Sequence, residues 1–280
     1  MVEDDNLETR LAEQDVFEPP ESFVEQANVT DPDIYEEFEE NWPECWEGAA
    51  DLLDWYEGYD QVLDDSNPPF YEWFTGGTLN ASYECVDRHL EERGDEVAIE
   101  WVGEPEDEAD RSITYEELHR EVNEFAAALR DLGVGEDDVV TMHMPMVPAH
   151  PIALLACARI GAPHSVVFAG FSASALAERM NAADSEYLIT ADGYYRRGDP
   201  LDHLSKSREG VEEVEHDVET VVVDRLERNG DGHGHDLTEN EHDYADLVAD
   251  HAGASVEPVE RDAEDMLFLM YTSGTTGQPK

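Results

Sequence analysis

From Ser112 onward the sequence alternates between two apolar patterns, and this alternation restricts the fold more than any other feature of the chain. Short apolar runs without turn residues alternate with longer segments in which apolar residues recur every three or four positions. The short runs are typical of buried strands, and the longer segments are typical of amphipathic helices. The pattern therefore predicts an α/β fold, in which a mostly parallel sheet is covered by helices on both faces.

Capping residues define several of the predicted helices. Thr114 and Glu117 have the spacing of a capping box, and Gly133 is the expected end of that helix. Asn80 or Ser82 is expected to begin an earlier helix. The predicted strands cover residues 97–102, 139–144, 165–168, 187–190, 220–224 and 266–271, and further helices are predicted to begin at Asp31, Pro151, Ser172, Asp202 and Thr238.

Changes in composition divide the chain into three parts. Residues 1–25 are acidic and aperiodic, and they predict a flexible tail. Residues 26–110 form a segment that is unusually rich in aromatic residues, and we expect these side chains to fasten the segment onto a larger body. Residues 111–280 contain the regular alternation of helices and strands.

Acidic residues dominate the whole chain. Asp and Glu number 70 against 16 Lys and Arg, which gives a formal net charge of −54. The charge is spread along the chain, whereas an acidic interaction tail would concentrate it in one block. At about 1 M salt the Debye length falls to about 3 Å, and the self-repulsion of such a surface is screened. The charge therefore predicts a cytoplasmic protein of an organism with a high internal salt concentration.

The same charge bears on the possible partners. Nucleic acids and anionic membranes are not attracted to such a surface, so we expect neither as a partner. No run approaches the ~18 apolar residues of a membrane span, and the first residues do not resemble a signal peptide. Cys45, Cys85 and Cys157 are far apart in the sequence. They predict buried free thiols in a reducing compartment, and neither a disulfide framework nor a zinc site.

Three loops are expected at the carboxyl ends of the strands, where ligands bind in parallel α/β sheets. Residues 272–280, which follow the last predicted strand, combine glycines with hydroxyl groups and a lysine, and this combination suits a polyphosphate. The second loop is residues 169–171. The third, residues 191–198, places Arg196 beside Arg197, and paired arginines match phosphate oxygens in geometry as well as charge. Simple neutralisation of nearby carboxylates is the alternative for these arginines.

Other candidate sites are weaker. Asp231, His233, His235 and Asp236 could bind a metal, but they lie in a glycine-rich stretch typical of a surface loop. His143, His150 and His164 have no metal-ligand spacing, so we expect them to be core histidines whose hydrogen bonds are satisfied. The sequence contains no Gly-x-Ser-x-Gly nucleophile elbow.

In these loops and the segments around them, the sequence resembles a known family, the AMP-forming acyl-coenzyme A synthetases, and within it the acetyl-coenzyme A synthetase branch. The segment 271–280, Tyr-Thr-Ser-Gly-Thr-Thr-Gly-Gln-Pro-Lys, is similar to the phosphate-binding signature of the adenylate-forming superfamily. The segments 73–90 and 144–171 resemble that branch more specifically. With the acidic composition, the resemblance implies the N-terminal portion of a haloarchaeal-type enzyme. Residues 26–110 would be the branch's N-terminal segment, and residues 111–280 the first part of its AMP-binding domain.

The resemblance implies an acetate or other short-chain carboxylate as substrate. The carboxylate attacks the α-phosphate of ATP to give an acyl-adenylate and pyrophosphate, and coenzyme A then takes the acyl group. Its cofactors would be ATP, coenzyme A and Mg²⁺, with the Mg²⁺ ligands and the catalytic residues outside this chain. The implied ATP phosphate contacts are Thr272, Ser273, Gly274, Thr275, Thr276, Gly277 and Lys280, and the implied coenzyme A contacts are Phe168, Gly170, Phe171, Arg196 and Arg197.

The sequence also departs from the family pattern. Ala169 replaces a frequent glycine, and Asp199 replaces a second arginine, for which Arg197 is the nearest substitute. Because the acyl pocket and the catalytic lysine of the family follow the phosphate signature, we expect this chain alone to be inactive and to need a C-terminal portion as partner. The alternatives are a non-catalytic protein that binds coenzyme A or nucleotide, and a ligase for propionate or another short-chain acid. An unrelated P-loop kinase is disfavoured, because its Gly-Lys-Ser/Thr motif is lacking.

Overall fold

The computed structural model describes residues 18–31, 33–226 and 236–272. The chain divides into two compact units, Met1–Ala50 and Asp51–Lys280. The first unit contains short helices, in which the Phe38 and Trp46 rings meet edge to face with centroids 5.9 Å apart. These elements are α2 (Glu21–Val24), α3 (Ile34–Glu40), η1 (Glu44–Trp46) and α4 (Glu47–Ala50).

The start of the first predicted helix is corrected by the structure. α3 begins at Ile34 with Asp33 at its N-cap position, instead of at Asp31. Asp31 has a different use, because its side chain accepts a hydrogen bond from the Asp33 N–H at 3.0 Å. Most of the predicted tail, residues 1–17, lies outside the described residues.

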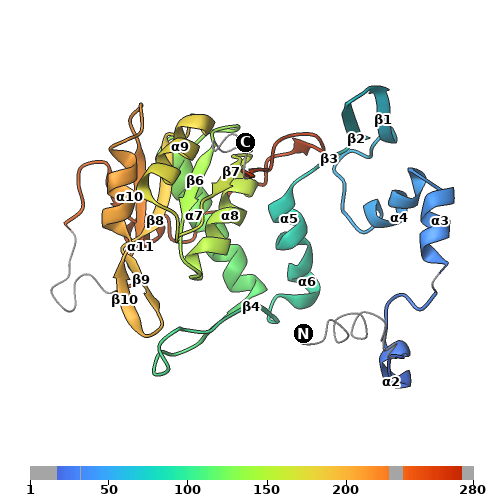
Figure 1. Ribbon diagram of the computed structural model, residues 1–280, viewed down its shortest axis with the longest axis horizontal. Helices are drawn as coiled ribbons and strands as arrows, with labels where there is room; N and C mark the ends of the chain where they lie inside the picture. Colours follow the sequence, from blue (N-terminus) through green and yellow to red (C-terminus); the bar gives the residue numbers. More distant parts are fainter. Residues whose placement is uncertain (1–17, 32, 227–235, 273–280) are drawn as a thin grey trace, which may run out of the picture. The chain divides into compact units, whose positions relative to one another are not determined.

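The second unit is built on a six-stranded sheet, and every pairing in it is parallel (Figure 1). The predicted mostly parallel sheet is therefore confirmed. Its central strand pairs with its neighbours so that Val140 lies opposite both His164 and Tyr187. In spatial order the strands are β12 (Glu241–Asp243), β11 (Glu219–Val223), β8 (Tyr187–Ala191), β6 (Val140–His143), β7 (His164–Val166) and β14 (Phe268–Leu269).

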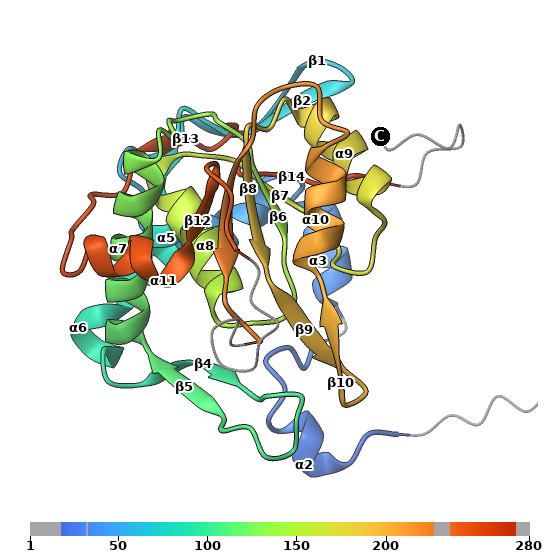
Figure 2. The ribbon, with the colours of Figure 1, turned by 90° about the vertical axis from the view of Figure 1, so that its left-hand side faces the viewer.

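Helices cover both faces of this sheet, as the alternation predicts. Figure 2 shows α7 (Tyr115–Asp131), α8 (Ala149–Ile160) and α11 (Tyr244–Asp250) on one face. The other face carries α9 (Ala173–Ala183) and α10 (Leu204–Val211), which pack against each other. The sheet is therefore the middle layer of three, and its strand ends are the places where a ligand can reach it.

The predicted capping box at the start of α7 is present. The Thr114 side chain accepts from the Glu117 N–H at 3.2 Å, and the Glu117 carboxylate accepts from the Thr114 N–H at 2.9 Å. The apolar face of α7 is buried, and Phe125 packs on Tyr244 of α11 with ring centroids 4.8 Å apart. α8 is apolar on nearly all sides, and it ends at Gly161, whose φ of 78° favours glycine.

The segment before the sheet is tied to α8 by polar contacts. Asn80, at the N-cap of α5, accepts from two helix N–H groups and donates its amide to the carbonyl oxygens of Ala158 and Val259. Asn80, and not Ser82, is therefore the cap. The remaining elements are β1 (Gln61–Asn67), β2 (Phe70–Thr75), β3 (Thr78–Leu79), α5 (Ala81–Cys85), η2 (Asp87–His89), α6 (Leu90–Arg93), β4 (Val97–Trp101), β5 (Arg111–Thr114), β9 (Gly193–Arg196), β10 (Asp199–Asp202) and β13 (Arg261–Asp262).

The prediction of a helix that begins at Thr238 is wrong. Glu241 starts β12 instead, and the helix begins three residues later with Asp243 as its N-cap. The Glu241 carboxylate still accepts from the Thr238 N–H at 2.8 Å, but it also accepts two hydrogen bonds from Arg208, at 2.7 and 2.6 Å. Pairing with β11 and this ion pair favour a strand over the helix that the local pattern predicts.

Two further predictions, of the loop 191–198 and of the strand 266–271, also need correction. The predicted loop 191–198 contains most of an antiparallel hairpin, because β9 pairs with β10, and Asp202 ends β10 instead of starting a helix. The predicted buried strand 266–271 is reduced to Phe268–Leu269 at the edge of the sheet. There the Phe268 and Met270 side chains are 54 % and 69 % exposed. Because an edge strand has a neighbouring strand on one side only, fewer of the described residues cover its apolar side chains.

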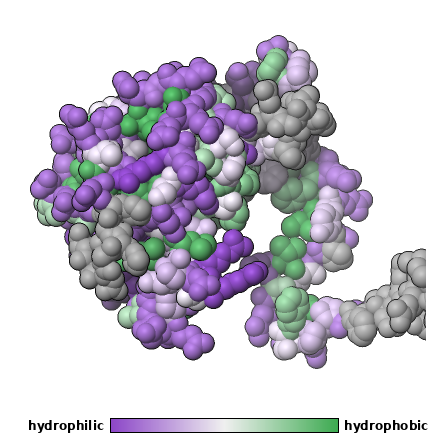
Figure 3. Space-filling model, turned by 60° about the vertical axis from the view of Figure 1, so that its left-hand side comes forward, coloured by the Kyte–Doolittle hydropathy of each residue, from purple (hydrophilic) through white to green (hydrophobic). Residues whose placement is uncertain are grey.

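The surface agrees with the acidic composition. The face seen in Figure 3 is mostly hydrophilic, with small hydrophobic areas between the polar residues. Among the described residues, no helix is both long enough and apolar enough to cross a membrane. The three cysteines are free; Cys157 is buried as expected, but Cys85 is exposed, which corrects the prediction of buried thiols.

Candidate functional site

A cavity of about 580 Å³ lies beyond the carboxyl ends of the parallel strands. Segments that follow β6, β7, β8 and β11 all contribute to it, which is the position that parallel α/β sheets favour for ligands. Three of the predicted coenzyme A contacts, Phe168, Gly170 and Arg196, line this one cavity. The other residues that line it are Trp101, Val102, Glu104, Met144, Pro145, Met146, Val147, His150, Val166, Val167, Ala169, Tyr194, Tyr195 and Arg225.

The loop after β7 owes its shape to contacts between its own residues. The Phe168 ring meets the Phe171 ring edge to face, with centroids 5.7 Å apart. A Cβ atom on Gly170 would lie 2.4 Å from the Phe168 ring, which is closer than side chains tolerate. A side chain at Gly170 would therefore displace the exposed Phe168 ring, and Phe171 supports the loop without lining the cavity.

The hairpin after β8 separates the two predicted arginines. Arg197 and Gly198 form its two-residue turn, with φ values of 56° and 85°. The Glu104 carboxylate accepts from the Gly198 N–H at 3.0 Å and holds this turn. Arg196 lines the cavity, whereas Arg197 lies at the turn and is not part of the cavity wall. Asp199 is exposed and lies opposite Arg196 in the hairpin.

A buried carboxylate organises the base of this hairpin. Asp192 Oδ1 accepts hydrogen bonds from the backbone N–H groups of Gly193, Arg225 and Leu226, at 2.8, 2.7 and 3.1 Å. Burial raises the pKa of Asp192 above its ordinary value, and these N–H groups oppose that rise. The carboxylate therefore ties the strand end of β8 to the segment after β11, and it brings Arg225 to the cavity.

Arg225 is a cavity residue that the sequence analysis missed. Its guanidinium lies over the rings of Trp101 and Tyr195, 5.2 and 5.0 Å from their centroids, and pairs with Glu108 at 2.5 Å. The Trp101 indole N–H donates to the Met146 carbonyl at 2.9 Å. This wall of the cavity therefore joins segments that are far apart in the sequence. The sequence signal that indicates Arg225 is its position two residues beyond the strand 219–223.

The distribution of free cations points to the same end of the sheet. Most described arginines have a carboxylate oxygen within 4 Å, as expected in a chain with a net charge of −54. All but one of the cations without such a carboxylate belong to the hairpin or contact the loop after β7. Lys206 of α10 donates to the Ala169 carbonyl at 3.2 Å, and Arg179 of α9 lies over the Phe171 ring. Among the described residues, the cations without such a partner are Arg130, Arg179, Arg196, Arg197 and Lys206.

A chain of buried hydrogen bonds lies beneath the loop after β7. Thr190 Oγ1 donates to the His143 carbonyl at 3.0 Å. Ser207 Oγ lies 2.8 Å from Thr190 Oγ1 and 3.0 Å from His143 Nδ1, so this hydroxyl links the two side chains. His203 Nε2 donates to the same carbonyl at 2.8 Å.

The prediction that His143, His150 and His164 have all their hydrogen bonds satisfied is wrong, because one ring nitrogen of each histidine is buried without a partner among the described residues. Burial, together with His203 and Lys206, lowers the pKa of His143 to about 3, and burial lowers the pKa of His203, so both rings are neutral near pH 7. The two rings lie against each other at a tilt of 44°, with centroids 4.1 Å apart. Among the described residues, the buried ring nitrogens without a hydrogen-bond partner are His143 Nε2, His150 Nε2, His164 Nδ1 and His203 Nδ1.

The predicted phosphate-binding loop lies almost entirely outside the described residues. Thr272 is the one predicted contact within them, and it is exposed; Ser273, Gly274, Thr275, Thr276, Gly277 and Lys280 are beyond them. β14, which leads to this loop, is the parallel neighbour of β7. Parallel neighbours end at the same edge of a sheet, so Thr272 follows a strand beside the one that carries the Phe168 loop. Nearly all of the weak metal candidate, residues 231–235, is also outside the described part.

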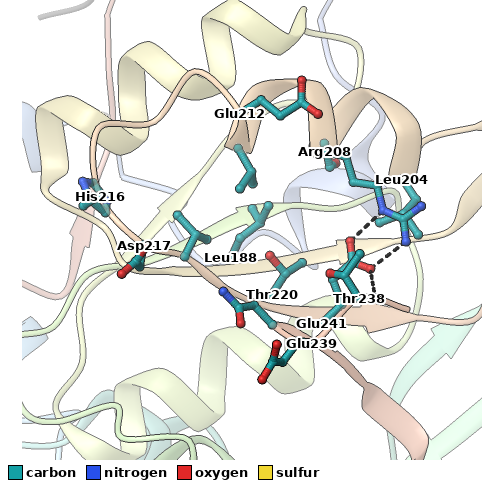
Figure 4. A pocket seen from close by; sticks show the side chains of 14 residues that line it. Leu188, Leu204, Arg208, Glu212, His216, Asp217, Thr220, Thr238, Glu239 and Glu241 are labelled. Carbon is teal, nitrogen blue, oxygen red and sulfur yellow. Dashed lines mark hydrogen bonds and ion pairs between the residues drawn. The ribbon is translucent and has the colours of Figure 1, made fainter. Parts of the chain in front are cut away.

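A second cavity, of about 550 Å³, lies at the opposite ends of the strands (Figure 4). Its walls come from α10 and from the first residues of β8 and β11, including Leu188 and Thr220. Figure 4 shows the pair of hydrogen bonds by which Arg208 is neutralised by Glu241. With that arginine paired and carboxylates on its rim, this cavity does not suit an anionic ligand.

Comparisons with known proteins agree on one family. The family model for AMP-binding enzymes matches residues 86–280, and the model for the acetyl-coenzyme A synthetase N-terminus matches residues 32–85. An acetyl-coenzyme A synthetase of Rubrobacter xylanophilus is 42 % identical over 269 residues, covering 94 % of this chain and 40 % of that protein. One of Streptomyces coelicolor is 44 % identical over 280 residues, covering 100 % of this chain and 42 % of that protein.

A solved structure extends the agreement to the fold. Acetoacetyl-CoA synthetase from Streptomyces lividans superposes with a TM-score of 0.76 at 26 % identity, over 94 % of this chain and 42 % of that one. The chain spans about two fifths of the length of these relatives. Its parallel sheet, its two family-model matches and the identity of its relatives lead to one conclusion: the chain belongs to the AMP-binding enzyme family, and it begins with the N-terminal segment of the acetyl-coenzyme A synthetases.

Proposed function

We propose that this chain is the N-terminal part of an acetate–CoA ligase that forms AMP. In the proposed reaction, the carboxylate of acetate attacks the α-phosphate of ATP, pyrophosphate leaves, and the thiol of coenzyme A then displaces AMP from the acyl-adenylate. The names of the curated relatives support the substrate class. The observation that carries the proposal is the cavity at the carboxyl ends of the strands, where Phe168, Gly170 and Arg196 meet among cations that have no carboxylate partner in the described part of the chain.

In this proposal the cavity holds the nucleotide end of coenzyme A. Phe168 and Gly170 offer an apolar ring and an accessible backbone, and Arg196 offers a guanidinium to a phosphate. Phe171 and Arg197 complete the proposed coenzyme A site from the loop and the hairpin turn. Arg197, beside Arg196 in the sequence, is proposed to stand in for the arginine that Asp199 replaces.

The phosphates of ATP are proposed to bind at Thr272, Ser273, Gly274, Thr275, Thr276, Gly277 and Lys280. Backbone N–H groups, hydroxyls and an ammonium can hold the phosphates in line and neutralise charge that develops on them. Mg²⁺ would add charge neutralisation when bound. Among the described residues there is no group of three or more side chains that could hold a metal ion, so its ligands are proposed to come from elsewhere in the protein.

Isothermal titration with coenzyme A at about 3 M KCl, where the surface charge is screened, tests the proposal. We expect binding by the wild-type chain, and we expect Arg196→Gln to weaken it about tenfold, the loss of one charged hydrogen bond. Arg130→Gln is the matched control, because Arg130 also has no carboxylate partner among the residues the structure describes but lies in the last turn of α7, away from the cavity. Failure of the wild type to bind, or equal affinities for wild type and Arg196→Gln, would contradict the proposal.

The alternatives lead to different results with the same protein. We expect no thioester from acetate, ATP and coenzyme A with this chain alone, because it spans about two fifths of its relatives' length. Turnover would overturn that expectation. If the protein that contains this chain binds coenzyme A but activates no acid, the non-catalytic alternative holds. Faster turnover of propionate than of acetate would support the other short-chain ligase.

The setting of the enzyme is also part of the proposal. The free cysteines support a reducing, cytoplasmic compartment, and the acidic composition supports a salt-adapted, haloarchaeal-type protein. The same composition supports small molecules as the ligands, with neither nucleic acid nor membrane as a partner. The three-part division at residues 25 and 110, and a C-terminal portion as partner, remain proposals.

A further inference from the structure

Arg179 of α9 contacts the residues that lead to both proposed ligand loops. Its guanidinium carbon lies 4.8 Å from the centre of the Phe171 ring and 5.6 Å from the centre of the Tyr271 ring. Both distances are within the range of cation–π attraction. The Tyr271 hydroxyl also donates to the Arg179 carbonyl at 3.1 Å, so backbone and side chain of Arg179 both hold Tyr271.

The two rings belong to different ligand loops. Phe171 ends the loop of the proposed coenzyme A site, and Tyr271 directly precedes Thr272, the first of the proposed ATP phosphate contacts. The strands before them, β7 and β14, are parallel neighbours, but the two aromatic residues are 100 positions apart in the sequence. One side chain therefore connects the segments that are proposed to meet two different phosphate-bearing ligands.

The surroundings of Arg179 are unusual for this chain. Most described arginines are paired with carboxylates, whereas Arg179 has none within 4 Å among the described residues. One of its guanidinium nitrogens donates to the Ala175 carbonyl of its own helix at 2.7 Å. Charge balance in an acidic protein does not explain an arginine in this position. A planar cation that stacks on two aromatic rings does, and lysine is not its equivalent there.

We propose that Arg179 is a positioning residue that couples the two ligand loops. A phosphate-bearing ligand at one loop restricts the Phe171 or Tyr271 ring, and through Arg179 it lowers the cost of restricting the other ring. The two ligand classes are coenzyme A at the first loop and a polyphosphate at the second, so the inference rests on the proposed function. Its consequence is positive cooperativity between these ligands.

Hydrogen–deuterium exchange on the ligand-free chain tests the connection without any ligand. Arg179→Met should raise amide exchange in both segments, 168–172 and 267–272, and leave the central strand β6 (Val140–His143) unchanged. Arg93→Met is the matched control, because Arg93 lies over the Tyr115 ring at 5.0 Å but belongs to another part of the unit. Faster exchange in one segment alone, or in neither, overturns the inference.

Calorimetry tests the cooperativity. Coenzyme A should bind the wild type at least about fivefold more tightly when tripolyphosphate is saturating, and its affinity should be independent of tripolyphosphate in Arg179→Met. Arg179→Lys should also lose the coupling, because it keeps the charge without the planar stacking group. Tyr271→Leu removes one ring and leaves Arg179 in place, and it should also lose the coupling. This variant replaces Arg179→Met in the test if Arg179→Met does not fold.

The outcomes separate the inference from the proposed function. Coupling that survives in Arg179→Met or Arg179→Lys, or is absent in the wild type while coenzyme A binds, overturns the inference alone. If the wild type binds no coenzyme A, the proposed function fails, and the exchange experiment by itself decides whether Arg179 connects the two segments.

Discussion

The ion pair between Arg159 and Asp87 should be a principal source of stability in the second unit, and Asp87→Asn tests this directly. The Arg159 side chain is 3 % exposed and the Asp87 side chain 14 %. Two parallel hydrogen bonds, of 2.7 and 2.9 Å, join the guanidinium to the carboxylate. Arg159 Nε also donates to the Val256 carbonyl at 2.5 Å, and His119 lies 3.3 Å from the carboxylate. The pair thus fastens the segment before the sheet to α8.

The magnitude follows from the burial of both charges. Burial raises the pKa of Asp87, but the hydrogen bonds from His119 and Arg159 and the charge of Arg159 outweigh it and lower the pKa to about 2. From an unfolded value near 3.9, this shift corresponds to about 2–3 kcal/mol of stability at neutral pH. Asp87→Asn also leaves the Arg159 charge buried without a partner, so the total loss should be about 3–5 kcal/mol.

The pH dependence gives a second, independent check. A carboxyl group whose pKa is lowered by folding stabilises the protein above its unfolded pKa, and the contribution is lost as the pH falls through the folded value. Between pH 7 and pH 3 about half of the Asp87 contribution should disappear. The difference in stability between wild type and Asp87→Asn should therefore shrink by about 1 kcal/mol over that range.

Urea unfolding at constant high KCl measures both effects, because urea leaves the ionic strength unchanged. The double variant Asp87→Asn/Arg159→Met completes a mutant cycle and should be more stable than Asp87→Asn alone, since it buries no unpaired charge. Arg93→Met, which breaks an exposed pair with Glu96, is the control and should cost much less than Asp87→Asn. A loss below about 1 kcal/mol in Asp87→Asn, or a pH-independent difference, would refute the reasoning.

Two further predictions concern protonation and salt. Because burial lowers the pKa of His143 to about 3, the folded chain takes up no proton there as the pH falls below the unfolded value of about 6.5, and folding stability drops. His143→Gln should therefore lose about 2 kcal/mol less than the wild type between pH 6.5 and pH 5 in urea unfolding, and equal slopes would show that His143 is not buried and neutral. Dialysis from about 3 M to about 0.1 M KCl should abolish the near-UV circular dichroism, because the net charge of −54 is then unscreened, and an unchanged spectrum at low salt would contradict the predicted salt adaptation.

Predictions from the sequence were most accurate where a signal is local. The Thr114–Glu117 capping box occurs, and Gly133 directly follows the C-cap residue Leu132 with a φ of 101°, because caps depend on residues three or four positions apart. The same local reasoning was wrong at Thr238 and Glu241. That spacing also suits a capping box, but pairing with β11 and the bond to Arg208, which is 33 residues away, favour a strand.

The candidate site shows the same division. The position of its loops followed from the alternation of strands and helices, because the carboxyl ends of parallel strands meet at one edge. Which arginine enters the cavity did not follow. Arg196 and Arg197 are adjacent in the sequence, and the two-residue turn of the hairpin places Arg196 in the wall and Arg197 at the tip.

The sequence by itself determined the fold class, the acidic surface and the family resemblance, because apolar periodicity, composition and the 271–280 signature are properties of the chain read in order. The tertiary structure decided which of the described cations have no carboxylate oxygen within 4 Å, that His143, Thr190 and Ser207 share a chain of buried hydrogen bonds, and that Arg179 lies over both Phe171 and Tyr271. The physical reason is that charge pairing and proton sharing depend on contacts between residues tens of positions apart. Such contacts exist only after the sheet has brought its strand ends together.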